Sequence, residues 1–390
     1  MGTDLASAAP RTLPGWLSGL CLTTLAIVLA AESGCTPKSQ SVDIKVDIAS
    51  QDALSADTAE LPVDPTWAVA TWSADWTDTA RSTPANGDAA AHAGRHLPVQ
   101  VWYPTEQLAG QSAAMLAPVA KGVFGVVLFV HGSSGTPKVY SGLCKRLAAF
   151  GYIVVAADFP LTSLLTDGGP SDWHVADQTG DLRFLADQVL GTGIPAWLAG
   201  HVDPAAGYAV VGHSTGGTVA LLAAYRSDEH DKRLRAVVDM SGDSCFFAPE
   251  FFATRSVPLL AMGATLDALV PAANNPARAF EFAQEPAFLV LLRGGTHLQM
   301  TDMAMDDPAD ASPTGLDDPL AQTLAAWGVN GSCRPVPPLG NDPQLGHDQQ
   351  RDLAAQVSAL FLKAYLSGMH TPFQAWLQNP GALVTVQYKP

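Results

Sequence analysis

The sequence predicts an α/β fold in which a mostly parallel central sheet is covered by helices on both faces. Short apolar runs recur along the chain, with the length and composition of strands that are buried on both faces. Helical patterns alternate with these runs, as expected for crossover connections between parallel strands. Such sheets bind ligands beyond the carboxyl ends of their strands. We therefore expect the chemistry of this protein in the loops that follow the apolar runs.

The expected elements follow one another without a repeat. The predicted strands cover residues 67–76, 97–103, 126–130, 152–157, 208–211, 234–238, 258–262 and 287–292. The predicted helices cover residues 139–150, 175–190, 215–226 and 351–366. The run at 126–130 consists only of Val, Leu and Phe. The helical pattern at 139–150 ends at Gly151.

Composition and charge exclude several classes of protein. The chain has 390 residues, of which 47% are hydrophobic and 15% charged, which is typical of a globular protein. Its net charge of −16 argues against nucleic acid or an anionic membrane surface as a partner.

The first 35 residues have a pattern typical of a signal peptide. Arg11 precedes an uncharged stretch at 16–31, which is too short for a comfortable membrane span. The stretch ends in Gly34-Cys35, which resembles a bacterial lipoprotein cleavage site, although Glu32 departs from the usual aliphatic residue. We expect an extracytoplasmic protein, tethered to a membrane through a lipidated Cys35. Plain secretion to the periplasm or medium, and a retained anchor helix, are the alternatives.

Residues 36–65 predict a flexible linker, because they are rich in Ser, Asp, Ala and Thr and contain no aromatic residue. We expect residues 66–390 to form the α/β domain. An exported chain permits disulfides, and the loop-like surroundings of Cys245 and Cys333 favour a bond between them. Cys144 falls on an apolar helical pattern and is expected to be a buried thiol.

A nucleophile-elbow pattern stands between one predicted strand and the helix that follows it. The pattern is Gly212-His213-Ser214-Thr215-Gly216, and its glycines allow the sharp turn that presents a serine at the top of a sheet. In such a turn Ser214 is the nucleophile, and the backbone N–H of Thr215 stabilises an oxyanion. His213 is expected to point into the packing of the elbow.

A nucleophilic serine needs a base and an acid, in the chain order Ser, acid, His. His297 comes directly after the predicted strand 287–292 and is the expected base. Asp267 and Asp239 each follow a predicted strand. Asp267 is the favoured acid, because a distinctive Gly…Asp…Val-Pro pattern surrounds it. Asp239 is the alternative, and Asp243 a weaker third candidate.

The loop 131–135, His-Gly-Ser-Ser-Gly, follows the predicted strand 126–130. The second oxyanion donor is expected from this loop. We expect the backbone N–H of Ser133 to supply it, with Thr215 as its partner.

Over residues 95–366 these features resemble the α/β-hydrolase superfamily. The resemblance is to its dienelactone-hydrolase-like branch, close to platelet-activating-factor acetylhydrolases and cutinase-like polyesterases. It is carried by residues 95–104 (RHLPVQVWYP), the helix around 177–185, the elbow, and the segments around Asp267 and His297. It implies a serine esterase that forms an acyl-enzyme and uses neither a cofactor nor a metal. A lipase or polyesterase, an amidase, and a non-catalytic surface protein with the same fold are the alternatives.

An acidic insertion is expected at about residues 298–348. Its aspartates are Asp302, Asp306, Asp307, Asp310, Asp317 and Asp318. Oxygen ligands of this kind can hold Ca²⁺, but their spacing does not match an EF-hand. We expect a solvated acidic loop that shapes one wall of the site.

Overall fold

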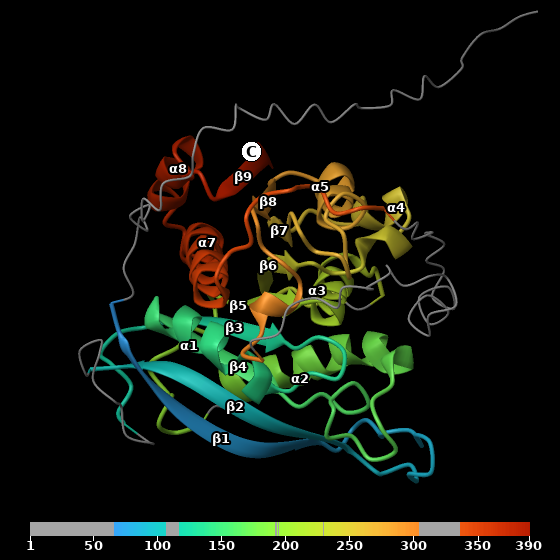
Figure 1. Cartoon of the computed structure of the whole chain (residues 1–390). Helices are drawn as coiled ribbons and strands as arrows, with labels where there is room; N and C mark the ends of the chain where they lie inside the picture. Colours follow the sequence, from blue (N-terminus) through green and yellow to red (C-terminus); the bar gives the residue numbers. More distant parts are fainter. Residues whose placement is uncertain (1–65, 107–116, 192, 194, 229, 304–335) are drawn as a thin grey trace, which may run out of the picture. The chain divides into compact units, whose positions relative to one another are not determined.

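The computed structural model describes residues 66–106, 117–191, 193, 195–228, 230–303 and 336–390 (Figure 1). The predicted leader, the linker and Cys333 lie outside these residues. Export, lipidation of Cys35 and the Cys245–Cys333 bond therefore stay predictions. Cys144 is a free, buried cysteine, as expected. Within the described ranges, no helix is long and apolar enough to cross a membrane.

A nine-stranded sheet forms the centre of the domain, in the order β1-β2-β4-β3-β5-β6-β7-β8-β9. Strands β3 to β8 run parallel, whereas β1, β2 and β9 each pair antiparallel with their neighbours. The strands are β1 (Ala68–Asp78), β2 (Arg95–Thr105), β3 (Gly125–Val130), β4 (Tyr152–Ala157), β5 (Tyr208–His213), β6 (Leu234–Met240), β7 (Leu259–Ala264), β8 (Ala287–Leu292) and β9 (Val384–Lys389). The predicted α/β fold with a mostly parallel sheet is confirmed.

Helices cover both faces of the sheet, and alternate strand residues enter two separate cores. Leu128 and Val130 of β3 join one core, while Val127 and Phe129 join the other. The first core is closed by α2 (Gln178–Leu190), α3 (Thr215–Tyr225), α4 (Pro249–Phe252) and α5 (Pro276–Phe282). The second is closed by α1 (Ser141–Ala149), α7 (His347–Ser367) and α8 (Thr371–Gln378).

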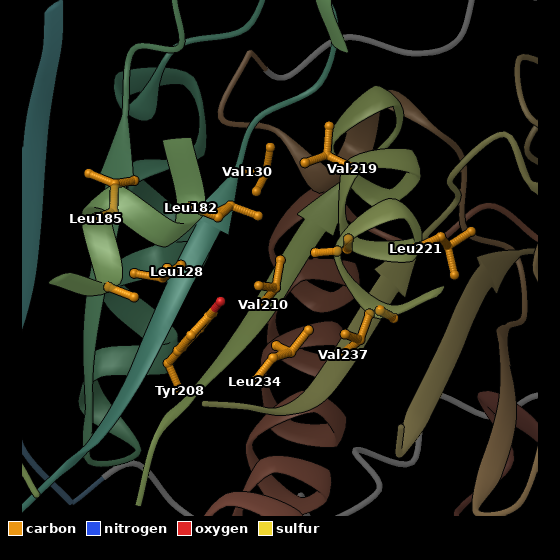
Figure 2. Packing of buried hydrophobic residues seen from close by; sticks show 14 of the residues in the cluster. Leu128, Val130, Leu182, Leu185, Tyr208, Val210, Val219, Leu221, Leu234 and Val237 are labelled. Carbon is orange, nitrogen blue, oxygen red and sulfur yellow. The ribbon is translucent and has the colours of Figure 1, made fainter. Parts of the chain in front are cut away.

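Figure 2 shows the first core between α2, α3 and the strands. Leu182 and Leu185 of α2 and Val219 of α3 lie over Leu128 and Val210 of the sheet. Full burial of each such side chain contributes about 1.5–3 kcal/mol relative to exposure. This packing holds β3 and β5 side by side, and their carboxyl ends carry the oxyanion loop and the elbow.

The structure differs from the sequence-based expectation in its short elements. The predicted helix 139–150 begins with a 3₁₀ turn, η1 (Pro137–Tyr140), before α1. The helices α4, α5 and α8 and the strand β9 were not predicted, so the strand at 287–292 is not the last one of the sheet. Strand β9 is an edge strand with only its first residue buried, so it lacks the apolar run that identifies the central strands.

Candidate active site

Ser214 occupies a sharp turn between β5 and α3. Its φ of 57° lies in the region that favours glycine, and its N–H donates to the carbonyl of Met240 at 2.8 Å. A side chain at Gly216 would collide with the backbone oxygen of Val130, so the close approach of α3 to β3 requires glycine there. Ser214 is partly exposed, although the residues on both sides of it are buried. The turn therefore presents the serine hydroxyl at the carboxyl end of the sheet.

His297 and Asp267 lie together in the loops that follow β8 and β7. Nδ1 of His297 and Oδ2 of Asp267 are 2.8 Å apart, and both side chains are almost completely buried. The other carboxylate oxygen accepts hydrogen bonds from the backbone N–H groups of Leu269 (3.1 Å) and Val270 (2.7 Å). Both oxygens of Asp267 are therefore held in place by hydrogen bonds. Because Nδ1 faces Asp267, a proton exchanged with a substrate or nucleophile would pass through Nε2 of His297.

A ring contact brings His297 to the elbow. The ring centroids of His297 and His213 are 4.6 Å apart, and His213 is the residue before Ser214 in the chain. The ring of His213 is buried within the elbow, where the sequence pattern placed it. Burial lowers the pKa of His213 well below its usual value, and the nearby His297 acts in the same direction. His213 is therefore a neutral neighbour of the candidate base.

Gln350 of α7 holds the loop that carries His297. Its Oε1 accepts a hydrogen bond from the N–H of Thr296 at 2.9 Å, and its Nε2 donates to the carbonyl of Thr296 at 2.7 Å. Gln350 is completely buried. Sequence reasoning missed this residue because it lies 54 positions from its partner and belongs to no motif.

Asp239, the alternative acid, is buried at the end of β6. Its Oδ1 accepts a hydrogen bond from the N–H of Gly242 at 2.8 Å, while its Oδ2 has no partner among the described residues. Burial raises the pKa of Asp239 to about 7, and the charge of Asp243 adds to the effect. Asp243 lies at the same strand end, where its N–H donates to Oγ1 of Thr218. The carboxylate that bonds Nδ1 of His297 is that of Asp267.

Three backbone amides of the loop 131–135 hold it in place by hydrogen bonds. The N–H of Gly132 donates to the hydroxyl of Tyr140, that of Ser134 to the carbonyl of Thr162, and that of Gly135 back to Gly132. Among residues 132–135, the amide of Ser133 is the one with no acceptor in the described part of the chain.

The same loop lies against the nucleophile. A Cβ built on Gly132 would come within 3.0 Å of the Cβ of Ser214. Thr215 is the first residue of α3, and its N–H makes no described hydrogen bond, as expected for the first turn of a helix. Neither the Ser133 amide nor the Thr215 amide has an acceptor among the described residues, and their role as oxyanion donors stays a prediction.

His131 fixes the loop to the end of β4. Its Nε2 accepts a hydrogen bond from the N–H of Phe159 at 3.2 Å, so its proton is on Nδ1, which donates to the carbonyl of Gly132 at 2.8 Å. Burial lowers the pKa of His131 to about 4. His131 is therefore neutral at physiological pH and acts as a fixed hydrogen-bonding bridge.

Two cavities of about 510 and 690 Å³ flank the segment that follows β4. Both volumes fall in the usual range of small-molecule sites. Pro98, Asp158 and Leu165 line both cavities, and neither cavity is lined by Ser214 or His297. Leu165 is 71% exposed. The segment thus places apolar surface beside the oxyanion loop, which it also holds through Thr162.

The described ends of the acidic insertion are bonded to the domain. The N–H of Asp302 donates to the carbonyl of Val139, and Oδ2 of Asp302 accepts from the N–H of Gly142 at 2.6 Å. Arg351 lies 3.4 Å from the other carboxylate oxygen. The other five aspartates lie outside the described residues. Calcium binding by the insertion stays a prediction.

Comparisons with known proteins match the fold and a segment of the sequence. Residues 92–242 match the chlorophyllase family model. This segment includes Ser133 and Ser214, but ends before Asp267 and His297. Chlorophyllase-1 of Citrus sinensis and that of Citrus unshiu are each 32% identical over 112 residues, 29% of this chain. The chain spans about a third of the length of these curated relatives.

A solved structure covers more of the chain. A ferulic acid esterase from Streptomyces cinnamoneus superposes with a TM-score of 0.56 and 21% identity, over 82% of this chain and 96% of the other. This likeness shows the fold alone. The finer branch inferred from the sequence stays a prediction. The chain thus has an α/β-hydrolase fold, and its residues 92–242 match the chlorophyllase family.

Proposed function

We propose that this protein is a serine hydrolase that cleaves carboxylic esters with Ser214, His297 and Asp267. The observation that carries the proposal is the buried hydrogen bond between His297 and Asp267, beside the strained turn of Ser214. The family match over residues 92–242 and the fold of a solved esterase support the same class of reaction.

In the first half of the reaction, Oγ of Ser214 attacks the ester carbonyl carbon and its proton passes to Nε2 of His297. The carbonyl oxygen becomes an oxyanion, which the N–H groups of Ser133 and Thr215 stabilise. The carbonyl then re-forms as the bond to the alcohol oxygen breaks. The leaving alcohol takes its proton from His297, and the acyl group remains on Ser214.

In the second half, a water molecule gives a proton to His297 and attacks the acyl carbon. The carboxylic acid leaves, and the proton returns from His297 to Oγ of Ser214. Asp267 holds the imidazole in one tautomer and stabilises its charged form throughout. The cycle needs no external oxidant, reductant or cofactor.

The test is hydrolysis of p-nitrophenyl esters from acetyl to palmitoyl by the wild type and by Ser214→Ala. The variant is expected to fold normally and to lose on the order of 10⁴- to 10⁶-fold in kcat. Covalent labelling by a fluorophosphonate probe should be lost in parallel. Turnover that survives in the variant would contradict the assignment of Ser214.

The chain-length series also separates the remaining alternatives. Turnover confined to short acyl chains indicates a small-ester esterase, whereas turnover that rises with chain length indicates a lipase or polyesterase. Labelling of Ser214 without ester turnover indicates an amidase, which amide substrates then test. Neither labelling nor turnover indicates a non-catalytic surface protein.

A further inference from the structure

A buried tyrosine hydroxyl lies between the oxyanion loop and the elbow. Tyr140 ends the 3₁₀ turn η1 and is 3% exposed. Its ring packs against Phe129 of β3 and His213 of β5, at centroid distances of 5.1 and 5.6 Å. The ring is thus fixed on two neighbouring strands of the sheet, with its hydroxyl toward the carboxyl ends.

The hydroxyl of Tyr140 has a partner on each side. It accepts a hydrogen bond from the N–H of Gly132 at 3.2 Å and lies 2.9 Å from Nδ1 of His213. A hydroxyl can accept and donate at once. The hydroxyl therefore bonds Nδ1 of His213 as donor or acceptor, according to the tautomer of that ring. Burial lowers the pKa of His213, which favours its neutral form in either tautomer.

Each of these two partners lies against a different part of the candidate site. Gly132 precedes Ser133 and lies against the Cβ of Ser214. His213 contacts the ring of His297 at 4.6 Å. One hydroxyl therefore ties the backbone of the oxyanion loop to the ring beside the base.

We propose that Tyr140 is a positioning residue, whose hydroxyl sets the spacing between the Ser133 oxyanion donor and His297. This inference rests on the proposed esterase function. In the transition state, negative charge develops at the oxyanion while His297 takes up a proton. Fixed donors stabilise such charges only if their geometry is set in advance. Tyr140 acts through Gly132 and His213, and does not itself touch the reacting atoms.

The test is Tyr140→Phe, with Tyr152→Phe as a matched control. Tyr152 is equally buried, and its hydroxyl donates to the carbonyl of Ala359 in α7. Neither residue belongs to the candidate site. We expect Tyr140→Phe to lower kcat by about 10- to 100-fold, less than the direct loss of an oxyanion donor. KM should change by less than about 3-fold, and Tyr152→Phe should leave kcat within about 2-fold.

A trifluoromethyl ketone inhibitor provides a second readout, because its adduct with the serine carries an oxyanion. We expect its inhibition constant to rise in Tyr140→Phe by about the same factor as kcat falls, since both depend on the oxyanion donors. Unchanged inhibition, or equal losses of kcat in both tyrosine variants, would overturn the positioning role. A wild type without Ser214-dependent turnover would instead contradict the esterase proposal itself, and this inference with it.

His213→Phe provides an independent variant, since it removes the partner of the Tyr140 hydroxyl at the other end of the same link. If Tyr140 and His213 act as one unit, the double variant loses no more kcat than the worse single variant. Losses that multiply would show that the two residues act separately, and would overturn the inference.

Discussion

Two aspartates at neighbouring strand ends have the same burial but different surroundings. Asp267 follows β7. One of its oxygens accepts hydrogen bonds from two backbone N–H groups, and the other bonds Nδ1 of His297. Asp239 lies at the end of β6. One of its oxygens accepts a hydrogen bond from one backbone N–H, and the second has no partner among the described residues. Burial accordingly raises the pKa of Asp239 to about 7.

The difference shows that position at a strand end does not decide which carboxylate pairs with His297. Both side chains are 0% exposed, and both follow parallel strands of one sheet. A buried carboxylate needs hydrogen-bond donors in place of the water it has lost. The loop after β7 supplies donors to one oxygen of Asp267 while His297 bonds the other, whereas the loop after β6 supplies one donor to Asp239.

The largest effect is expected from Asp267→Asn. The amide cannot stabilise a charged imidazole and can hold His297 in the wrong tautomer, so kcat should fall by about 10⁴-fold. The measurement is p-nitrophenyl butyrate hydrolysis at pH 8, with circular dichroism to confirm folding. Asp239→Asn is the matched control, and a larger loss in that variant would reverse the comparison.

A smaller effect is expected from Gln350→Met, which removes both hydrogen bonds to Thr296 and keeps a similar side-chain volume. The loop of His297 should loosen, and kcat should fall by about 10-fold, since small misplacements of a catalytic group cost up to about 100-fold. Gln356→Met changes another buried glutamine of α7 and serves as the control. Equal activity in both variants would remove Gln350 from the support of the site.

The smallest effect on activity is expected from Asp239→Asn, which should keep kcat within about 2-fold of the wild type, as expected for a residue outside the machinery. Its effect is on stability. The folded protein holds a proton on Asp239 up to about pH 7, whereas the unfolded chain releases it near the ordinary pKa of 3.8. This group therefore lowers the free energy of unfolding as pH rises from about 4 to 7, by roughly 2–4 kcal/mol.

The asparagine does not titrate, so the variant should lack this decline. Urea unfolding at pH 5 and pH 8 measures it, and the variant should gain stability relative to the wild type at the higher pH. Parallel pH dependence in the two proteins would show that Asp239 is ionised in the fold.

The central strands and the edge strand β1 could be predicted from the sequence, but the edge strand β9 and the short helices could not. The strands at 152–157 and 287–292 match the predicted bounds, because uninterrupted apolar runs mark strands that are buried on both faces. Strand β9 is half-exposed, and α5 has only seven residues. Neither carries a periodic pattern long enough to stand out from loop sequence.

The candidate site could be predicted where it depends on local turns, and not where it depends on distant contacts. The elbow of Ser214 is encoded within five residues, and His297 follows a clear strand. The roles of Tyr140 and Gln350 arise from hydrogen bonds to residues 8 and 54 positions away. A single sequence carries no signal for such pairs. The choice between Asp267 and Asp239 likewise depended on which side chain reaches His297.

The positive φ of Ser214 has a consequence for how natural selection acts on this chain. A residue other than glycine in such a conformation costs roughly 1–3 kcal/mol, and glycine would avoid most of that cost. Selection for stability alone would therefore favour glycine at position 214. The serine lowers the stability of the fold, and proteins tolerate such a loss where a side chain serves a purpose. Under the proposed function, that purpose is to present the nucleophile.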